Sequence, residues 1–129
     1  MTPELTYLAW ISLFTAVMWV PYILNMITVR GLADAVGYPD NPKPLAPWAE
    51  RMKRAHANAV ENLVVFAALV LAAHLAGVSN EITVMASMIY FWARVLHFAS
   101  FAFAIPWIRT LTFVTGSACQ VLIGLQILK

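Results

Sequence analysis

Residues 51–73 read RMKRAHANAVENLVVFAALVLAA, and they join a dense polar run to an apolar one without an intervening Gly or Pro. At 100° per residue, five of the polar side chains fall within an arc of about 100° on one helical face. They are Arg51, Arg54, Asn58, Glu61 and Asn62. Lys53 and His56 point to other sides of the same helix. The stretch therefore predicts one continuous helix with a polar face in its first half and an apolar second half.

The composition is typical of a membrane protein. Of the 129 residues, 62% are hydrophobic and 11% are charged, whereas charged residues make up about 25% of an average soluble domain. A helix needs roughly 20 apolar residues to cross a bilayer, and residues 5–29 contain no Asp, Glu, Lys, Arg or His. We predict an all-α integral membrane protein, in which a single domain over residues 1–129 forms a bundle of four transmembrane helices. We expect these helices at about residues 5–30, 47–76, 80–104 and 107–128.

The positions of the basic residues predict the orientation. Five basic residues cluster around the loop between the first and second helices: Arg30, Lys43, Arg51, Lys53 and Arg54. Arg109 lies beside the turn between the third and fourth helices, whereas residues 77–81 contain no Lys or Arg. The positive-inside rule then places both basic loops in the cytoplasm and both termini outside. We expect a multi-pass protein of a bacterial inner membrane, with the endoplasmic reticulum as the alternative. The net charge of +2 could indicate an anionic partner, but in a helical membrane protein such cations serve mainly as topology signals. We therefore expect membrane lipids as partners and no nucleic acid.

Several features predict how the helices bend and pack. Pro21 removes a backbone donor inside the first helix and predicts a kink there. Residues 31–47 contain two Gly and four Pro, which favours an extended, turn-rich loop. In the last helix, a stripe of residues at every fourth position would allow another helix to approach closely. The stripe consists of Thr112, Gly116, Gln120 and Gly124.

The third predicted helix also carries charge. Arg94 and His97 are one turn apart and share a face. A buried cation at membrane depth requires a partner, and Glu61 is the only carboxylate at comparable depth in another helix. We therefore expect an ion pair between Arg94 and Glu61, which either locks two helices together or forms part of a site.

Four arginines are expected near the cytoplasmic interface: Arg30, Arg51, Arg54 and Arg109. The planar guanidinium group suits two-pronged recognition of carboxylates, although each arginine could equally be a membrane anchor. Together with Asn58, Glu61 and His97, the four arginines suggest a small site for an anionic ligand. The single Cys119 offers no framework for a metal, and no metal site is expected.

At these residues the chain resembles a known family. The relevant patterns are R-x-x-R-A-H-x-N-x-x-E-N at residues 51–62, A-R-x-x-H at residues 93–97 and P-x-x-R-T at residues 106–110. They are similar to those of the MAPEG superfamily, the membrane-associated proteins in eicosanoid and glutathione metabolism. The resemblance covers nearly the whole chain. It implies a homotrimer that binds glutathione as co-substrate between subunits and receives a lipophilic small-molecule substrate from the bilayer.

The resemblance also implies roles for individual residues. The positions that match the family's glutathione site are Arg30, Arg54, Asn58, Glu61, His97, Arg109 and Thr110, with Arg94 beside them. Arg109, with Thr110 as a hydrogen-bond donor, would be catalytic, because a free thiol has a pKa of about 8.5 and a neighbouring cation favours the reactive thiolate. Arg30 and Arg54 would bind carboxylates, Glu61 the amino group and Asn58 the backbone amides.

Three positions depart from the catalytic members of the family. Ala57 stands where some catalytic members have a second arginine that contacts glutathione. Phe101 and Phe113 stand where those members have tyrosines, whose hydroxyls would help to activate the thiol. Three functions therefore stay open. The chain is a glutathione-dependent transferase or peroxidase that acts on a lipophilic electrophile, a non-catalytic member that binds a lipid or presents a partner protein, or a small structural subunit of a larger membrane complex.

Overall fold

Helices make up most of the chain in the computed structural model, which describes all 129 residues and contains no strand. The elements are α1 (Pro3–Val17), α2 (Trp19–Arg30), α3 (Leu32–Val36), α4 (Pro47–Leu75), α5 (Glu81–Ala102) and α6 (Pro106–Leu128). By length and composition, four segments can cross a membrane: Pro3–Arg30, Pro47–Leu75, Glu81–Ala102 and Pro106–Leu128. The predicted all-α fold with four membrane-spanning helices is confirmed.

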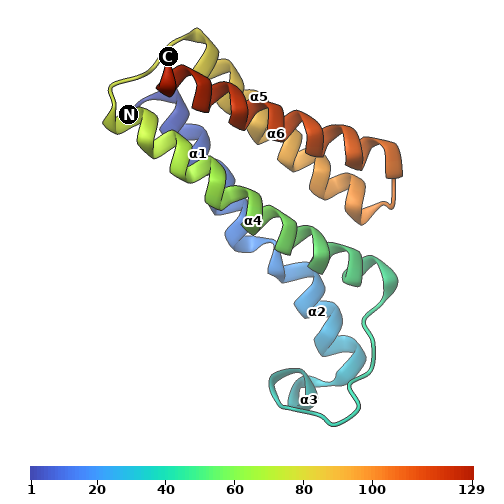
Figure 1. Cartoon of the computed structure of the whole chain (residues 1–129). Coiled ribbons are helices and arrows are strands. Elements are labelled where there is room, and N and C mark those ends of the chain that lie inside the picture. Colours follow the sequence, from blue (N-terminus) through green and yellow to red (C-terminus); the bar gives the residue numbers. More distant parts are fainter.

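The first spanning segment is broken into α1 and α2 at Met18. Pro21 has no N–H with which to bond the carbonyl of Val17, so the helical ladder is interrupted there. The N–H of Met18 bonds instead to the carbonyl of Thr15 at 3.3 Å. The kink predicted from Pro21 is therefore present, and beyond it α2 packs against α4 (Figure 1).

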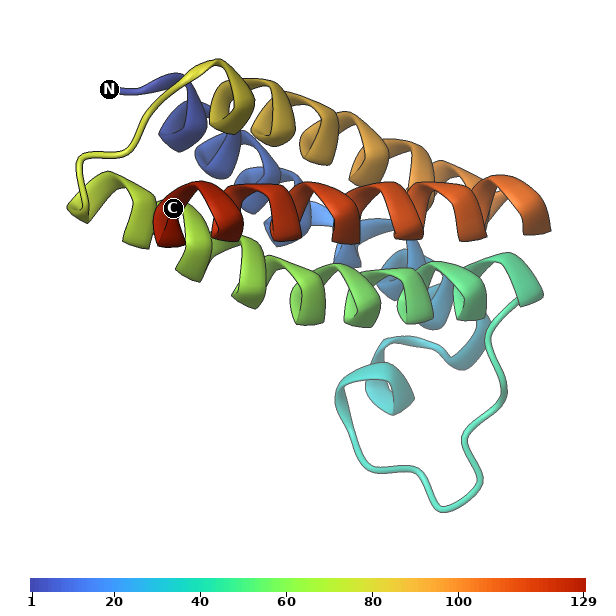
Figure 2. The same ribbon diagram turned by 45° about the horizontal axis from the view of Figure 1, so that its top comes forward.

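The four spans run the length of the bundle, with α5 and α6 forming a closely packed hairpin (Figures 1 and 2). Both termini and the turn at residues 76–80 lie at one end, which we call the terminal end. The opposite end carries residues 31–46 and the turn at residues 103–105, and we call it the loop end. The sequence predicted an extended loop at residues 31–47, but Leu32–Val36 form the short helix α3 because these five residues contain no Gly or Pro.

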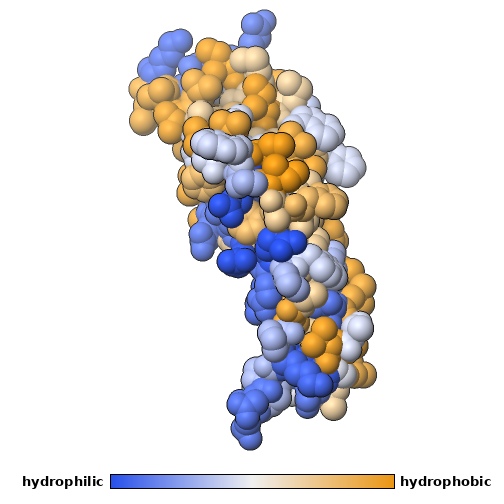
Figure 3. All heavy atoms as spheres, turned by 90° about the vertical axis from the view of Figure 1, so that its right-hand side faces the viewer, coloured by the Kyte–Doolittle hydropathy of each residue, from blue (hydrophilic) through white to orange (hydrophobic).

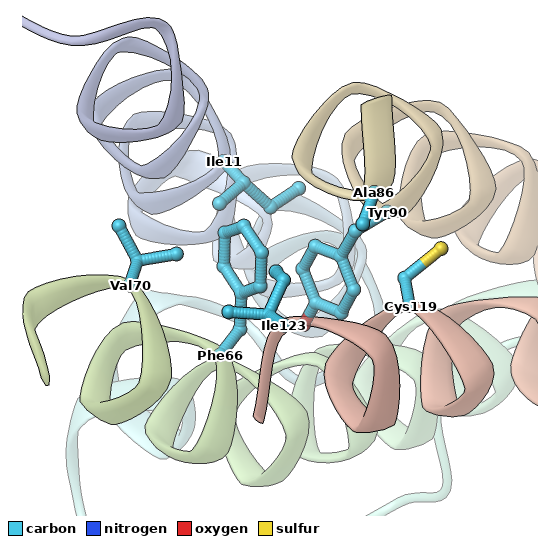
Figure 4. Packing of buried hydrophobic residues seen from close by; sticks show 7 residues of the cluster. All are labelled: Ile11, Phe66, Val70, Ala86, Tyr90, Cys119 and Ile123. Atoms are coloured by element: carbon cyan, nitrogen blue, oxygen red, sulfur yellow. The ribbon is translucent and has the colours of Figure 1, made fainter. Parts of the chain in front are cut away.

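The core lies towards the terminal end, where side chains from four helices meet (Figure 4). The rings of Phe66 and Tyr90 stack with their centroids 3.9 Å apart and their planes 10° apart. Around them pack Ile11, Val70, Ala86, Cys119 and Ile123. A Cβ atom on Gly116 would lie 3.6 Å from Arg94 Cδ and 3.7 Å from the Tyr90 ring. The small-residue stripe of α6 therefore allows the close packing that was predicted for it.

Large apolar side chains cover much of the outer surface, as expected for a protein whose solvent is lipid. In Figure 3, hydrophobic residues predominate in the upper part of the visible face, and hydrophilic residues gather in its middle and lower parts, towards α2 and α3. The polar chemistry of this face is thus concentrated on the side of the loop end.

Candidate functional site

A crevice of about 120 Å³ opens at the loop end, where the start of α4 meets the turn between α5 and α6. Its polar lining comes mainly from three arginines: Arg51, Arg54 and Arg109. The turn is tight because Ala104 adopts a left-handed conformation, with φ of 58°. This turn brings Arg109, in the first part of α6, next to Phe101 at the end of α5.

Arg51 holds two helices together. Its Nε donates to the carbonyl of Phe101 at 3.1 Å and its Nη2 to the carbonyl of Ala102 at 3.2 Å. The last carbonyls of a helix have no partner within the helix, so Arg51 caps α5 from α4. Its guanidinium group is largely committed to this structural role.

Arg54 and Arg109 have unused donors. Neither guanidinium group makes a hydrogen bond or an ion pair within the chain, and both side chains are exposed. The guanidinium carbon of Arg109 lies 5.2 Å from the centroid of the Phe101 ring, which is cation–π geometry. The crevice therefore presents two open forks of N–H donors, the arrangement that suits carboxylates and other anions.

Of the eight residues of the predicted site, only Arg54 and Arg109 line the crevice. Two of the other six, Arg30 and Thr110, donate to backbone carbonyls elsewhere. Arg30 Nε donates to the carbonyl of Lys43 at 2.7 Å, which ties the end of α2 to the following loop. Thr110 donates its hydroxyl to the carbonyl of Pro106 at 3.3 Å, within its own helix. Within one chain, the structure does not bring either residue together with Arg54 and Arg109.

A second group of predicted residues forms a buried network between the helices. Arg94 is 3% exposed, and its Nη2 donates to Asn58 Oδ1 at 2.6 Å. Asn62 donates to the same oxygen at 3.3 Å and to the carbonyl of Asn58 at 2.9 Å. Gln120 of α6 donates to the carbonyl of Asn62 at 3.1 Å. The network joins three helices, and it leaves Arg94 Nε and Nη1 without partners.

The predicted ion pair between Arg94 and Glu61 is wrong. Arg94 bonds to Asn58, and Glu61 is exposed on the outer face of α4. The physical reason is that Glu61 lies at the edge of the polar arc, about 60° from Asn58 around the helix. The amide therefore faces α5 while the carboxylate faces away.

Glu61 occupies the middle of a membrane-spanning helix, since α4 runs from Pro47 to Leu75. Its outward neighbours include Ala57, Val60 and Val64, and the carboxylate has no partner in the chain. A bare carboxylate in hydrocarbon costs several kcal/mol. Within one chain, the outer face of α4 therefore carries a carboxylate that nothing compensates.

His97 is 3% exposed and is surrounded by aromatic rings. The Phe101 ring lies 5.4 Å from the imidazole between centroids, and the Phe113 ring lies 6.3 Å from it. Phe101 therefore contacts both His97 on one side and Arg109 on the other. This ring therefore lies between the buried His97 and the crevice.

The side-chain contacts that fasten α2 to the start of α4 were not predicted from the sequence. The hydroxyl of Tyr22 lies 2.7 Å from His56 Nδ1, and Asn25 Oδ1 accepts from the N–H of Ala46 at 2.9 Å. Two signals could have revealed them. Tyr22 and Asn25 share one face directly after Pro21, and His56 points away from the polar arc of its own helix.

Comparison with known proteins shows the family to which the chain belongs. A sequence model of the MAPEG family matches residues 7–129. No curated protein matches the chain significantly. The family model covers nearly the entire chain, including the motif of α4, the Arg94 and His97 pair of α5 and the Arg109 turn. The chain therefore belongs to the MAPEG family.

Proposed function

We propose that the protein is a glutathione-dependent transferase or peroxidase that acts on a lipophilic electrophile. The observation that carries the proposal is the crevice at the loop end, where Arg54 and Arg109 present guanidinium groups without partners. Glutathione carries two carboxylates, one ammonium group and a thiol. The carboxylates and the deprotonated thiol are groups to which guanidinium cations bind.

The residues present fit this ligand. Arg54 suits a carboxylate, and the nearby acid of α4, Glu61, suits the ammonium group. Asn58 already accepts from Arg94, but its amide nitrogen donates no hydrogen bond within the chain and is available to a ligand carbonyl. Arg94 is the positioning residue for Asn58, because it fixes the orientation of the amide.

The size of the crevice supports a site that a second copy of the chain completes, and the family resemblance implies that the assembly is a homotrimer. A volume of about 120 Å³ is well below the roughly 300–1,000 Å³ of pockets that enclose small-molecule ligands, so this crevice by itself does not enclose a tripeptide. A ligand bound to Arg54 must therefore extend beyond one chain. A neighbouring copy would enclose it and would also cover Glu61 on the outer face of α4.

Arg109 would perform the central chemical role. Bound glutathione supplies a thiol, and the guanidinium group of Arg109 favours its deprotonated form by direct charge interaction. The Phe101 ring contacts that guanidinium group in cation–π geometry and helps to position it. The apolar outer surface would admit a lipophilic electrophile from the bilayer. On this proposal the loop end faces the cytoplasm, in a bacterial inner membrane.

Calorimetric titration of the purified protein with glutathione tests the proposal. Binding at millimolar glutathione and an ultraviolet thiolate signal are expected. Arg109→Ala should abolish the thiolate signal, whereas Lys53→Ala, which changes an exposed cation outside the crevice, should leave it intact. Absence of binding in the wild-type protein would refute the assignment.

A second candidate is a non-catalytic member that binds a lipid or presents a partner protein. The packing around His97 favours it, because both neighbouring rings belong to phenylalanines, which have no hydroxyl. Glutathione binding without turnover of any electrophile would support this candidate. Turnover that is lost in Arg109→Ala would eliminate it.

A further inference from the structure

A second cavity, of about 260 Å³, lies at the terminal end, at the opposite end of the bundle from the arginine crevice. It is enclosed by the start of α1, the end of α4 and the turn that follows α4. Its polar lining comes from Thr2, Glu4, His74 and Ser79, and its apolar lining includes Val70 and Ala73. None of these residues belongs to the glutathione site proposed above.

Glu4 is the distinctive residue of this cavity. The side chain is only 4% exposed. One carboxylate oxygen, Oε2, accepts from the hydroxyl of Thr83 at 3.1 Å, and the other, Oε1, is buried without any partner. No cation of the chain pairs with it. A buried carboxylate with half of its acceptor capacity unused is costly, although its place in the first turn of α1 offsets part of the cost.

Buried atoms without partners occur at two other residues, but in different surroundings. Ser87 Oγ and the Nε and Nη1 atoms of Arg94 also lack hydrogen bonds. Neither of those residues lines a cavity, so there is no space beside them for a guest molecule. Glu4 combines an unsatisfied charge with an adjacent empty volume, and this combination indicates a binding site.

We propose that this cavity binds a primary ammonium group, carried either by the headgroup of phosphatidylethanolamine or by a small soluble amine. An ammonium group supplies three N–H donors, which match the carboxylate of Glu4 and the hydroxyls of Thr2 and Ser79. The methylene next to the nitrogen would contact Val70 and Ala73. The chain's own N-terminal amine is not the occupant, because Met1 is 92% exposed and does not line the cavity.

A metal ion fits the same cavity poorly. Hard divalent cations take six or more oxygen ligands, usually with several carboxylates. The chain contains no group of three or more His, Cys, Asp or Glu side chains that could hold a metal. One carboxylate beside two hydroxyls is therefore a site for a singly charged donor.

Thermal unfolding of the full-length protein in detergent tests the proposal. Ethanolamine hydrochloride should raise the Tm of the wild-type protein above that in potassium chloride or choline chloride of equal ionic strength. In native mass spectrometry, retention of phosphatidylethanolamine over phosphatidylcholine would identify the lipid as the source, whereas a Tm rise without such retention would identify a soluble amine. An equal Tm in all three salts, together with no preference for phosphatidylethanolamine, would overturn the proposal.

Variants connect the effect to the cavity. Glu4→Gln keeps an acceptor for Thr83 but removes the charge, and it should weaken ethanolamine binding at least about tenfold. Glu81→Gln changes an exposed carboxylate at the same end and should leave binding unchanged. His74 is an exposed residue of the cavity wall, so His74→Lys should also weaken binding by repulsion while His74→Gln does not. Unchanged ethanolamine binding in either Glu4→Gln or His74→Lys would refute the site, so the test is still decisive if one of the two variants does not fold.

Discussion

Asn58→Ala should destabilise the protein through Arg94 rather than through Asn58 itself. The substitution removes the only side-chain acceptor of the buried guanidinium group, the Oδ1 atom at 2.6 Å, while Nε and Nη1 already lack partners. A hydrogen bond to a charged group contributes about 1.5–3 kcal/mol. We therefore expect the unfolding equilibrium to shift by roughly tenfold to a hundredfold.

A double-mutant cycle isolates this contribution. In an Arg94→Met background no buried cation remains, so Asn58→Ala should cost less than about 1 kcal/mol, the value of an ordinary hydrogen bond. The coupling free energy between the two residues should then be about 1–2 kcal/mol. The higher helix propensity of alanine occurs in both arms of the cycle and cancels.

The assay is denaturant unfolding in detergent micelles, followed by tryptophan fluorescence without glutathione. The matched control is the cycle between Glu61→Gln and Arg94→Met, for which no coupling is expected because the two side chains do not contact each other. Equal costs of Asn58→Ala in both backgrounds, or strong coupling through Glu61, would refute the reasoning.

Three further predictions concern packing, capping and chemistry. Gly116→Leu should destabilise the protein by about 1–3 kcal/mol because Arg94 occupies the space beside Gly116. In Gly116→Ala the added Cβ meets only ordinary van der Waals contacts, so this variant should be neutral or stabilising by up to about 1 kcal/mol. Denaturant unfolding measures both changes. Arg51→Ala should lower the free energy of unfolding by about 1–2 kcal/mol, because the last carbonyls of α5 lose their donors. Arg51→Lys, which keeps a donor, is the control, and equal Tm values for the two variants would contradict this expectation. Phe101→Tyr adds a hydroxyl to the ring that lies against Arg109, and on the proposed function it should raise kcat for glutathione conjugation of an aryl halide severalfold. Steady-state kinetics measure this effect, and an unchanged kcat would be the opposing result.

The sequence was sufficient to predict the fold because two simple signals agreed. Apolar runs of spanning length defined four membrane helices, and Pro21 indicated where the first would break. The stripe around Gly116 indicated close packing with α5. Each of these predictions depended only on residues that are close together in one helix. Their relative positions follow from regular helical geometry.

The candidate site could be predicted only in part. Helical geometry placed Asn58 and Glu61 on one polar arc, but it could not decide which of them meets Arg94, because that depends on how α4 is rotated against α5. The carbonyl partners of Arg30 and Arg51 were equally inaccessible, since any backbone oxygen can accept. Glu4 was missed because its partner, the hydroxyl of Thr83, is 79 positions away in the sequence.

The break at Met18 leaves the first span with two halves that tolerate mutation differently. α1 contributes Ile11 to the packed core, where the loss of a single methylene group affects stability. α2 buries no residue and is attached by the directional bonds of Tyr22, Asn25 and Arg30. Saturation mutagenesis should therefore yield a permissive second half, in which bulk varies freely while three side chains keep their chemistry.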